Sequence, residues 1–473
     1  MSVEPPQNPL HERYASREMA AIFSERNRYG QWRRIWIALA EAQMELGLPI
    51  TAEQIEALRR VAGDTDFRRV AEIERETRHD VVAHLRHFAE QAPEAGGILH
   101  LGATSAFVGD NTDVLLTREA LQLTETRLVT VVRELAGFAE RTADTPTLAY
   151  THLQPAQLTT VGKRACLWLQ DFLADLHEVR ARLDHLRCRG AKGTTGTQAS
   201  YLKLFDGDHA KVVELDRLVS EKLGFERRFP ITGQTYPRKQ DSQVLAALAG
   251  VGESTHKFGT DVRLLQGLGE LAEGFGKKQV GSSAMPYKRN PIRSERMCSL
   301  ARKLLTDTWN GPLTASVQWL ERSLDDSAGR RLVLPDAFLL ADAVLTVAAH
   351  VASGLTVRSE SVAARVNREL PFMVVENLMM EATTEGGDRQ ELHERLRELS
   401  LTAHQAVGAG GGNPLFDLLA DEPAFDRDVD ELRSIQPESL TGRAAEQVAE
   451  FLREVVEPAI AGRAAFEVEE PRV

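Results

Sequence analysis

Hydrophobic residues recur every three, four or seven positions along several long stretches of the chain, which is the spacing of an amphipathic helix. The four clearest stripes are Val114, Leu121, Leu128 and Leu135; Ala165, Leu169, Phe172, Leu176, Val179, Leu183 and Leu186; Val244, Leu248, Val251, Thr255, Phe258, Val262 and Leu265; and Leu340, Val344, Val347 and Val351. Runs of about 30 residues give helices of about 45 Å that pack at a shallow angle, as in left-handed bundles. The middle of the chain has no convincing alternation of hydrophobic and polar residues. We therefore predict an all-α fold built on an elongated central bundle, with no strand at its centre.

Turn residues mark where these helices should begin. The first is expected to follow a turn and helix cap at 109–113, and the second to start around Pro155. The third should follow 233–237. The fourth should have Asn290 as its N-cap and Pro291 as its first helical residue.

The chain divides into three predicted domains. Residues 1–105 form an N-terminal helical domain, and residues 106–357 form the central long-helix bundle. Residues 358–473 form a C-terminal helical domain, because glycine- and proline-rich stretches such as 408–414 break it into shorter helices. We expect the tail, 463–473, to be loosely held.

Composition narrows the classes of protein that fit. The 473 residues are 42% hydrophobic and 27% charged, and no uncharged apolar run approaches the roughly 20 residues that span a bilayer. The N-terminus lacks the features of a secretory signal, and Cys166, Cys188 and Cys298 are typical of reduced core thiols, so we expect a cytoplasmic protein. A net charge of −12 argues against nucleic-acid binding, and it means that local Arg and Lys side chains must capture any anionic substrate.

A loop at residues 281–291, here named the signature loop, combines hydroxyl groups with basic residues directly before a predicted helix start. The helix dipole and Lys288 favour negative charge there, which would stabilise an alkoxide on a serine that acts as a base. The loop offers two such serines, Ser282 and Ser283. The physical chemistry of the sequence does not choose between them.

Four histidines attract attention. His84 and His87 lie at i, i+3 and suggest a metal site, but without a third ligand we expect a solvated helix face and no metal. His79 lies between two charged residues and is a better functional candidate. An imidazole can donate a proton near neutral pH, which makes His152 a candidate general acid, although it is also placed to cap the helix predicted at Pro155.

The signature loop resembles that of the fumarase/aspartase superfamily, and its segment Ala-Met-Pro-Tyr-Lys-Arg-Asn-Pro resembles the adenylosuccinate lyase family in particular. Further segments that resemble this family follow in the expected order over about 320 residues: Arg13-Tyr14, Thr77-Arg78-His79-Asp80, Gly102-Ala103-Thr104-Ser105, Thr151-His152-Leu153-Gln154-Pro155, Gln234-Thr235-Tyr236 and Ser327 with Arg330-Arg331. The C-terminal third matches less distinctly, and we assign no site residues there.

The resemblance implies an enzyme that breaks a C–N bond β to a carboxylate and releases fumarate, without a metal or an organic cofactor. It implies that Ser282 is the base, His152 the general acid, and His79 a supporting or phosphate-binding group. Thr104, Ser105, Lys288 and Asn290 resemble the carboxylate-binding groups of the family. The resemblance extends to nucleotide-phosphate and ribose contacts at Arg13, Tyr14, Arg296, Arg322, Ser327 and Arg331, and to further substrate contacts at Arg78, Asp80 and Gln234.

The expected helix directions imply an assembly. If consecutive helices alternate in direction, Thr104 and Ser105 lie near Gln234 at one end of the bundle, about 45 Å from His152 and Ser282 at the other. One subunit then cannot close a site, which predicts a homotetramer with dihedral symmetry and shared active sites. The resemblance, and not the geometry, implies that His152 and Ser282 come from different chains.

The expected substrates are adenylosuccinate, split into AMP and fumarate, and the succinylated imidazole carboxamide ribotide of purine synthesis. One alternative is a related lyase that acts on argininosuccinate or another fumarate adduct, which Tyr287, Arg289 and the set of arginines disfavour. A second alternative is a non-catalytic scaffold of the same fold, which is disfavoured because every candidate catalytic residue is present.

Overall fold

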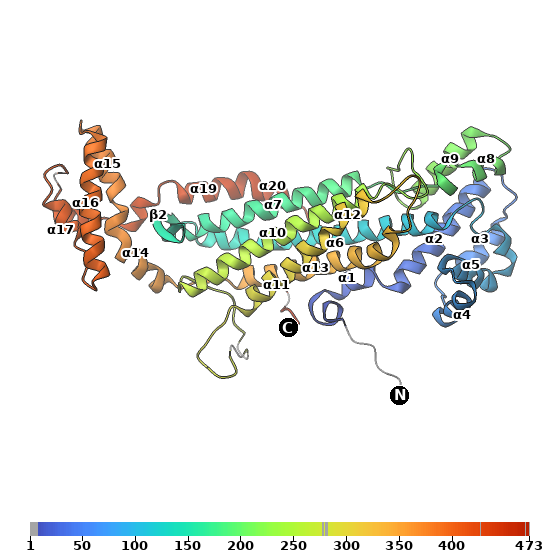
Figure 1. Ribbon diagram of the computed structural model, residues 1–473, viewed down its shortest axis with the longest axis horizontal. Coiled ribbons are helices and arrows are strands. Elements are labelled where there is room, and N and C mark those ends of the chain that lie inside the picture. Colours follow the sequence, from blue (N-terminus) through green and yellow to red (C-terminus); the bar gives the residue numbers. More distant parts are fainter. Residues whose placement is uncertain (1–7, 277–278, 280–281, 426, 469, 473) are drawn as a thin grey trace.

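The computed structural model describes residues 8–276, 279, 282–425, 427–468 and 470–472; Gly281 of the signature loop and the first seven residues lie outside them. Long helices lie lengthwise beside one another and give the molecule an elongated shape (Figure 1). The central helices are α6 (Ser105–Arg141), α7 (Val161–His185), α10 (Lys239–Gly267), α11 (Ile292–Thr308), α12 (Asn310–Ser316) and α13 (Asp326–Gly354). The stripes predicted from the sequence fill the core between them; Leu121, Phe172 and Phe258, for example, are fully buried. The predicted all-α architecture with an elongated bundle is confirmed.

Three of the predicted helix starts are wrong, one of them by a single residue: α11 begins at Ile292, and its N-cap is Pro291 and not Asn290. Helix α6 begins at Ser105, so 109–113 is not a turn but part of its first turns. Its polar residues face inward: Asn111, for example, donates from Nδ2 to the carbonyls of Phe107 and Gly190. Helix α7 begins at Val161 and not at Pro155.

A β-hairpin takes the place of that missing helical turn, so the prediction of no strand in the centre is also wrong. Strand β1 (Pro146–Thr151) pairs antiparallel with β2 (Gln154–Thr160), consistent with the β propensity of its threonines. His152 and Leu153 form the turn, with φ of +53° and +59°. His152 therefore does not cap a helix. A second, two-residue pairing joins β3 (Leu271–Ala272) to β4 (Thr356–Val357).

The N-terminal core contains Trp32, Trp36 and Phe88 and also takes in Tyr201 and Leu215 from later in the chain. The elements at this end are α2 (Glu25–Glu45), α3 (Ala52–Arg60), α4 (Phe67–Thr77), α5 (Asp80–Gln91), η2 (Pro93–Ile98), η3 (Thr194–Gly196), α8 (Ala199–Leu204) and α9 (His209–Lys222). The two elements that precede them, η1 (Leu10–Tyr14) and α1 (Arg17–Ile22), pack Leu10 and Met19 into the core of the bundle instead. The N-terminal core thus draws on residues from both sides of the predicted boundary at 105.

The predicted solvated face of α5 is wrong. His84 and His87 are only 3% and 4% exposed. The imidazole of His84 stacks on Tyr29 at 3.9 Å between ring centroids, and His87 Nε2 accepts from the backbone N–H of Asp66. Among the described residues, no group of three or more His, Cys, Asp or Glu is placed to hold a metal ion. The two histidines pack the core of this end.

The C-terminal part forms a separate small core and then returns to the bundle. Its elements are α14 (Ser359–Met373), α15 (Val375–Thr384), α16 (Arg389–Gly408), α17 (Leu415–Ala420), α18 (Val429–Ser434), η4 (Pro437–Leu440), α19 (Ala444–Phe451), η5 (Leu452–Val456) and α20 (Glu457–Ile460). Leu396 and Leu415 belong to the small core, whereas Val448 and Val456 belong to the core of the bundle. Helices α19 and α20 accordingly lie along the bundle beside α7 (Figure 1). The tail that follows is attached to α6, since Arg133 donates to the Arg463 carbonyl at 2.6 Å and the Phe466 N–H donates to Thr130. The expectation of a loosely held tail is therefore wrong for 463–468, and residues 469 and 473 lie outside the described part of the chain.

One described helix, α13, is long and apolar enough by composition to cross a membrane. In the structure, 72% of its most apolar stretch is buried among the other helices. Its Asp342 is fully buried and accepts from Arg127 and from the backbone N–H of Ser16. This is the environment of a core helix in a bundle.

Candidate active site

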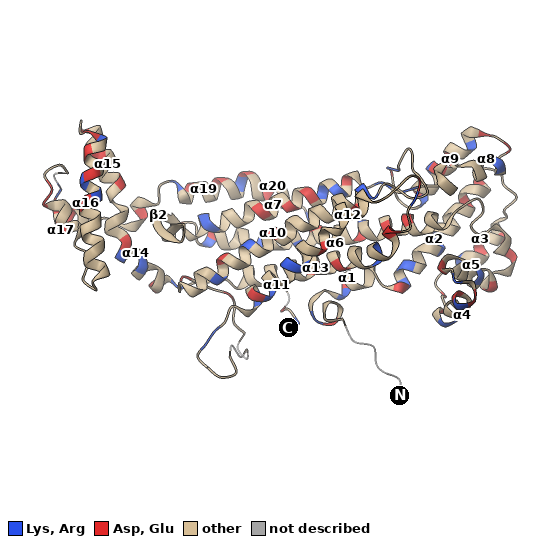
Figure 2. Cartoon of the chain, in the orientation of Figure 1, with Lys and Arg blue, Asp and Glu red and all other residues tan. Residues whose placement is uncertain are grey.

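A cavity of about 710 Å³ lies where the N-terminal core meets the bundle, near the starts of α6 and α13. Six arginines and six acids line it: Arg28, Arg78, Arg238, Arg322, Arg330 and Arg331, and Glu25, Glu74, Asp80, Asp110, Asp113 and Asp326. Elsewhere the two signs of charge are interspersed along the molecule without a continuous basic face (Figure 2). The cavity is therefore a local concentration of arginine in a protein of net charge −12.

The structure brings half of the predicted site residues together in this cavity. Its lining includes Arg78, His79, Asp80, Ser105, Gln234, Arg322, Ser327 and Arg331. Thr104 joins them, because its hydroxyl accepts from Gln234 Nε2 at 3.0 Å. Thr104, Ser105 and Gln234 thus lie at one end of the bundle, as the helix directions predicted.

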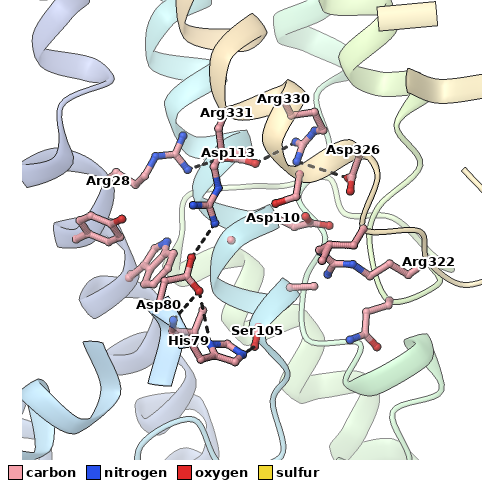
Figure 3. A pocket seen from close by; sticks show the side chains of 18 of the residues that line it. Arg28, His79, Asp80, Ser105, Asp110, Asp113, Arg322, Asp326, Arg330 and Arg331 are labelled. Atoms are coloured by element: carbon pink, nitrogen blue, oxygen red, sulfur yellow. Dashed lines mark hydrogen bonds and ion pairs between the residues drawn. The ribbon is translucent and has the colours of Figure 1, made fainter. Parts of the chain in front are cut away.

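The break between α4 and α5 presents His79 to the cavity. Arg78 ends α4 in the left-handed conformation with φ of +55°, and His79 then serves as the N-cap of α5. Its Nδ1 accepts from the backbone N–H of Val82 at 3.4 Å, so in this arrangement the ring proton lies on Nε2. Nε2 lies 3.4 Å from Ser105 Oγ (Figure 3). A ring held in this way offers an N–H to a group bound in the cavity.

Asp80 and Arg331 form an ion pair across the cavity at 2.7 Å (Figure 3). Burial alone would raise the pKa of Asp80, but hydrogen bonds from Arg331 and the Val81 N–H outweigh it and bring the pKa below its usual value. The carboxylate stays ionised and orients the guanidinium of Arg331, a side chain that is 62% exposed. Arg331 therefore keeps donors available for a ligand.

Beneath this pair lies a buried network that the sequence analysis missed. Arg238 binds Asp110 at 2.9 Å and Asp326 at 2.6 Å, and Arg330 binds Asp113 at 3.0 Å. Arg330 also binds Asp241 and Tyr236, and Arg28 binds Asp113. Burial opposes ionisation of Asp113, yet the charges of Arg330 and Arg28 lower its pKa. Charged residues that repeat on the inward face of a predicted helix, as Asp110 and Asp113 do, are the signal that could have revealed this network.

Two arginines that line the cavity are not held in ion pairs by the described residues. Within the described part of the chain, Arg78 and Arg322 form no ion pair, although each lies among charged neighbours. Arg322 is half-buried in the segment that connects α12 to α13. A guanidinium in this state can bind phosphate or carboxylate oxygens in a bidentate manner.

The other predicted site residues lie elsewhere. Arg13 and Tyr14 in η1 lie close to Arg296 in α11, whose pKa is lowered by burial and by the charge of Arg13. His152 is exposed at the turn of the β1–β2 hairpin. Strand β2 of this hairpin lies near the end of the bundle opposite to helices α2 to α5 (Figure 1). The cavity therefore contains neither Arg13, Tyr14 and Arg296 nor His152.

The signature loop projects from the bundle between β3 and α11 (Figure 1). Ser282 is half-buried there, and its Oγ accepts from the backbone N–H of Met285 at 3.1 Å. Lys288 is exposed, and α11 begins two residues after Asn290. A hydroxyl oxygen that already accepts a backbone N–H is better able to carry negative charge. None of the three residues lines the described cavity.

Comparison with known proteins places this long-helix bundle, with a charged cavity at one end, in the class of lyases. Residues 12–305 match the family described as lyase. Residues 371–451 match the family described as adenylosuccinate lyase C-terminus. The chain belongs to the adenylosuccinate lyase family.

Full-length relatives agree with this assignment. Adenylosuccinate lyase of Schistosoma mansoni is 49% identical over 457 residues, and that of Saccharomyces cerevisiae is 48% identical over 460 residues. Each alignment covers 96% of this chain and 95% of the relative. The predicted family is confirmed.

Among solved structures, the chain resembles 3-carboxy-cis,cis-muconate lactonizing enzyme from Pseudomonas putida with a TM-score of 0.82 and 24% identity, covering 96% of this chain and 100% of that one. It resembles fumarate lyase from Mesorhizobium sp. BNC1 with a TM-score of 0.81 and 24% identity, covering 97% and 100%. At this identity the likeness establishes the fold.

Proposed function

We propose that the protein cleaves adenylosuccinate into AMP and fumarate, and cleaves the succinylated imidazole carboxamide ribotide of purine synthesis in the same way. The observation that carries the proposal is 48–49% identity to adenylosuccinate lyases along nearly the whole chain. The cavity supports it, since a substrate with carboxylates and a phosphate needs several fixed cations.

The reaction is a β-elimination. In our proposal Ser282 removes a proton from the carbon next to the one that carries the nitrogen. The added negative charge spreads into the carboxylate attached to that deprotonated carbon. The bond to nitrogen then breaks, and His152 protonates the departing amino nitrogen. The two carbons form the double bond of fumarate, and AMP leaves with its amino group restored.

The described residues of the cavity suit the binding steps. Thr104 and Ser105 lie at the N-terminus of α6, where the helix dipole favours a carboxylate. Arg322, Ser327 and Arg331 supply donors for phosphate and ribose oxygens. We assign the Nε2–H of His79 to a substrate oxygen beside them, with Arg78, Asp80 and Gln234 as further contacts. Lys288 and Asn290 are assigned to the carboxylate, and Arg13, Tyr14 and Arg296 to the phosphate and ribose.

We further propose a homotetramer in which neighbouring subunits complete each site. The separation of the cavity, the hairpin and the signature loop within one chain supports this arrangement. A second support is an exposed apolar surface on α12 and the residues on both sides of it, with Trp309, Leu313, Trp319 and Leu320 each more than half exposed. Apolar surface of this extent is typical of a protein interface.

We also infer a cytoplasmic location, because the three cysteines are buried as free thiols, as in a reducing compartment. Neither nucleic acid nor membrane is proposed as a partner, in keeping with the net charge of −12.

Fumarate absorbance tests the proposed activity. Purified protein is mixed separately with adenylosuccinate, the succinylated imidazole carboxamide ribotide and argininosuccinate. We expect fumarate from the first two. Fumarate from argininosuccinate alone would refute the proposal, and no fumarate from any of the three would favour a non-catalytic scaffold.

A further inference from the structure

The C-terminal tail that follows α20 is fixed to the bundle over much of its length. The backbone N–H of Phe466 donates to Thr130 Oγ1 at 3.0 Å. The guanidinium of Arg127 lies 4.1 Å from the centre of the Phe466 ring. Ala465 and Val468 pack against the core of the bundle. The tail is therefore held in a definite place as it approaches its last described residues.

There Glu470 meets Arg293, the second residue of α11. The Arg293 side chain is only 8% exposed, and its guanidinium binds Oε1 of Glu470, a side chain that is 71% exposed, at 2.9 Å. It also donates to the carbonyl of Gly274 at 2.6 Å, just after β3. Among the described residues, no other carboxylate forms an ion pair with this guanidinium. A Cβ on Gly276 would lie 3.5 Å from Glu470 Oε1, so the carboxylate also adjoins the connection between β3 and α11.

Both ends of this β3–α11 connection meet at the same place. The buried Glu273 carboxylate accepts from the backbone N–H groups of Arg293 and Ser294 at 3.0 and 2.9 Å, and from the Ser294 hydroxyl at 2.6 Å. Gln266 accepts from the backbone N–H of Glu273 and donates to the carbonyl of Arg289 at 2.9 Å. The first and last residues of the connection are thus tied to each other and to the end of α10.

We propose that Glu470 is a positioning residue for the signature loop, so that the C-terminal tail is a working part of the active site. Glu470 neutralises Arg293, and Arg293 with Glu273 fixes the points at which the connection leaves and rejoins the bundle. Those points determine where Ser282 is presented. The inference rests on the proposed function, because it assigns a consequence for the elimination step.

The physical reason is the burial of Arg293. Without Glu470 a buried guanidinium keeps only a carbonyl partner, and it can recover solvation only by moving toward water. That movement releases the carbonyl of Gly274 and loosens the start of the connection. A small displacement of a base slows the chemical step while leaving most binding contacts intact.

Glu470→Gln in the full-length protein tests the contact against a matched control, Glu467→Gln. Glu467 lies on the same tail, is exposed and forms no ion pair within the described residues. We expect Glu470→Gln to lower kcat on adenylosuccinate by about fivefold with KM changed less than about twofold, and Glu467→Gln to match the unchanged protein.

Trypsin provides a readout that does not depend on activity. The sequence of the connection carries four trypsin sites, at Lys277, Lys278, Lys288 and Arg289. Cleavage of the native protein reports how often the connection opens. We expect cleavage there to be about fivefold faster in Glu470→Gln than in Glu467→Gln.

Slower turnover together with faster cleavage supports the inference. In a protein that cleaves adenylosuccinate, equal behaviour of the two variants overturns the inference, and so does either change without the other. If the unchanged protein releases no fumarate from adenylosuccinate, the proposed function fails. The cleavage rates would then still decide whether Glu470 holds the connection.

Discussion

At the scale of single residues, His79 has two roles, one for each nitrogen of its ring. Nδ1 accepts the N–H of Val82 and starts α5, and Nε2 faces Ser105 and the cavity. The first role sets the tautomer required for the second. The N-terminus of α5 thus fixes the tautomer of His79, and His79 in turn caps α5.

His79→Asn separates the two roles. Asparagine is a good N-cap, so α5 should keep its stability, but it removes the ring N–H that faces the cavity. We expect the melting temperature to stay within a few degrees and kcat/KM to fall by about 10²-fold. Thermal unfolding and fumarate release measure the two effects.

His79→Ala is the comparison, because it loses both the cap and the donor. Its free energy of unfolding should fall by about 1 kcal/mol, so it should melt at a lower temperature. A fully active His79→Asn protein would show that His79 serves only as a helix cap.

At the scale of elements, spacing predicted the bundle helices because their stripes are long and continuous. It failed at the start of α6, where Asp110 and Asn111 are buried against Arg238 and Gly190. Those partners lie far along the chain, so local spacing cannot reveal that these polar residues face inward. The hairpin at 146–160 was missed for a related reason, since its short strands carry little periodic signal. The residues of the cavity were predicted from motifs, whereas the network beneath them needed the fold.

Gly162 tests how closely α6 and α7 approach at their junction. A Cβ at this position would lie 2.4 Å from the Ala139 carbonyl oxygen and 2.7 Å from Ala143 Cα. Because both neighbours are backbone atoms, Gly162→Ala should lower the free energy of unfolding by about 1–3 kcal/mol. Gly137→Ala is the control, since the Cβ there meets only the flexible end of Arg141 at 3.3 Å. It should be neutral or stabilising, as judged by chemical unfolding.

The buried face of α5 predicts acid sensitivity. Burial, assisted by the charge of Arg33, lowers the pKa of His84 to about 4, from 6.5. The unfolded chain therefore binds a proton below pH 6.5 that the folded protein refuses until about pH 4, so stability falls as pH drops through this window. Between pH 7 and pH 5 the loss from this group should be about 2 kcal/mol.

Chemical unfolding of His84→Phe at the two pH values measures this loss. The phenyl ring can keep the stacking on Tyr29, so the variant should lose less stability between pH 7 and pH 5 than the unchanged protein. An unaltered slope in His84→Phe would assign the acid sensitivity to other groups.

At the scale of the whole molecule, the candidate catalytic groups are distributed over its length. The cavity lies beside the N-terminal core, and the hairpin that carries His152 lies toward the other end (Figure 1). The proposed tetramer resolves this separation, because a neighbouring chain that runs in the opposite direction brings its hairpin or loop to the cavity.

Mixing inactive variants tests this arrangement. His152→Ala and Ser282→Ala should each be inactive, because each lacks one of the proposed groups. When equal amounts are dissociated and reassembled together, about a quarter of the sites should hold both intact groups, so activity should recover to about 25%. Size-exclusion chromatography with tagged chains checks that mixed tetramers form. Mixed tetramers with no more activity than the separate variants would refute shared sites.

The unbroken length of α6 has a mechanical consequence. Its 37 residues form a rod of about 55 Å that begins at Ser105 beside the cavity and ends next to the hairpin strands. In an assembly of antiparallel copies, the length of α6 sets the distance between paired sites. One inserted residue lengthens the rod by about 1.5 Å and also turns everything beyond it by about 100°. The length of α6 can therefore change only by whole helical turns if the hairpin is to keep its orientation toward its partner.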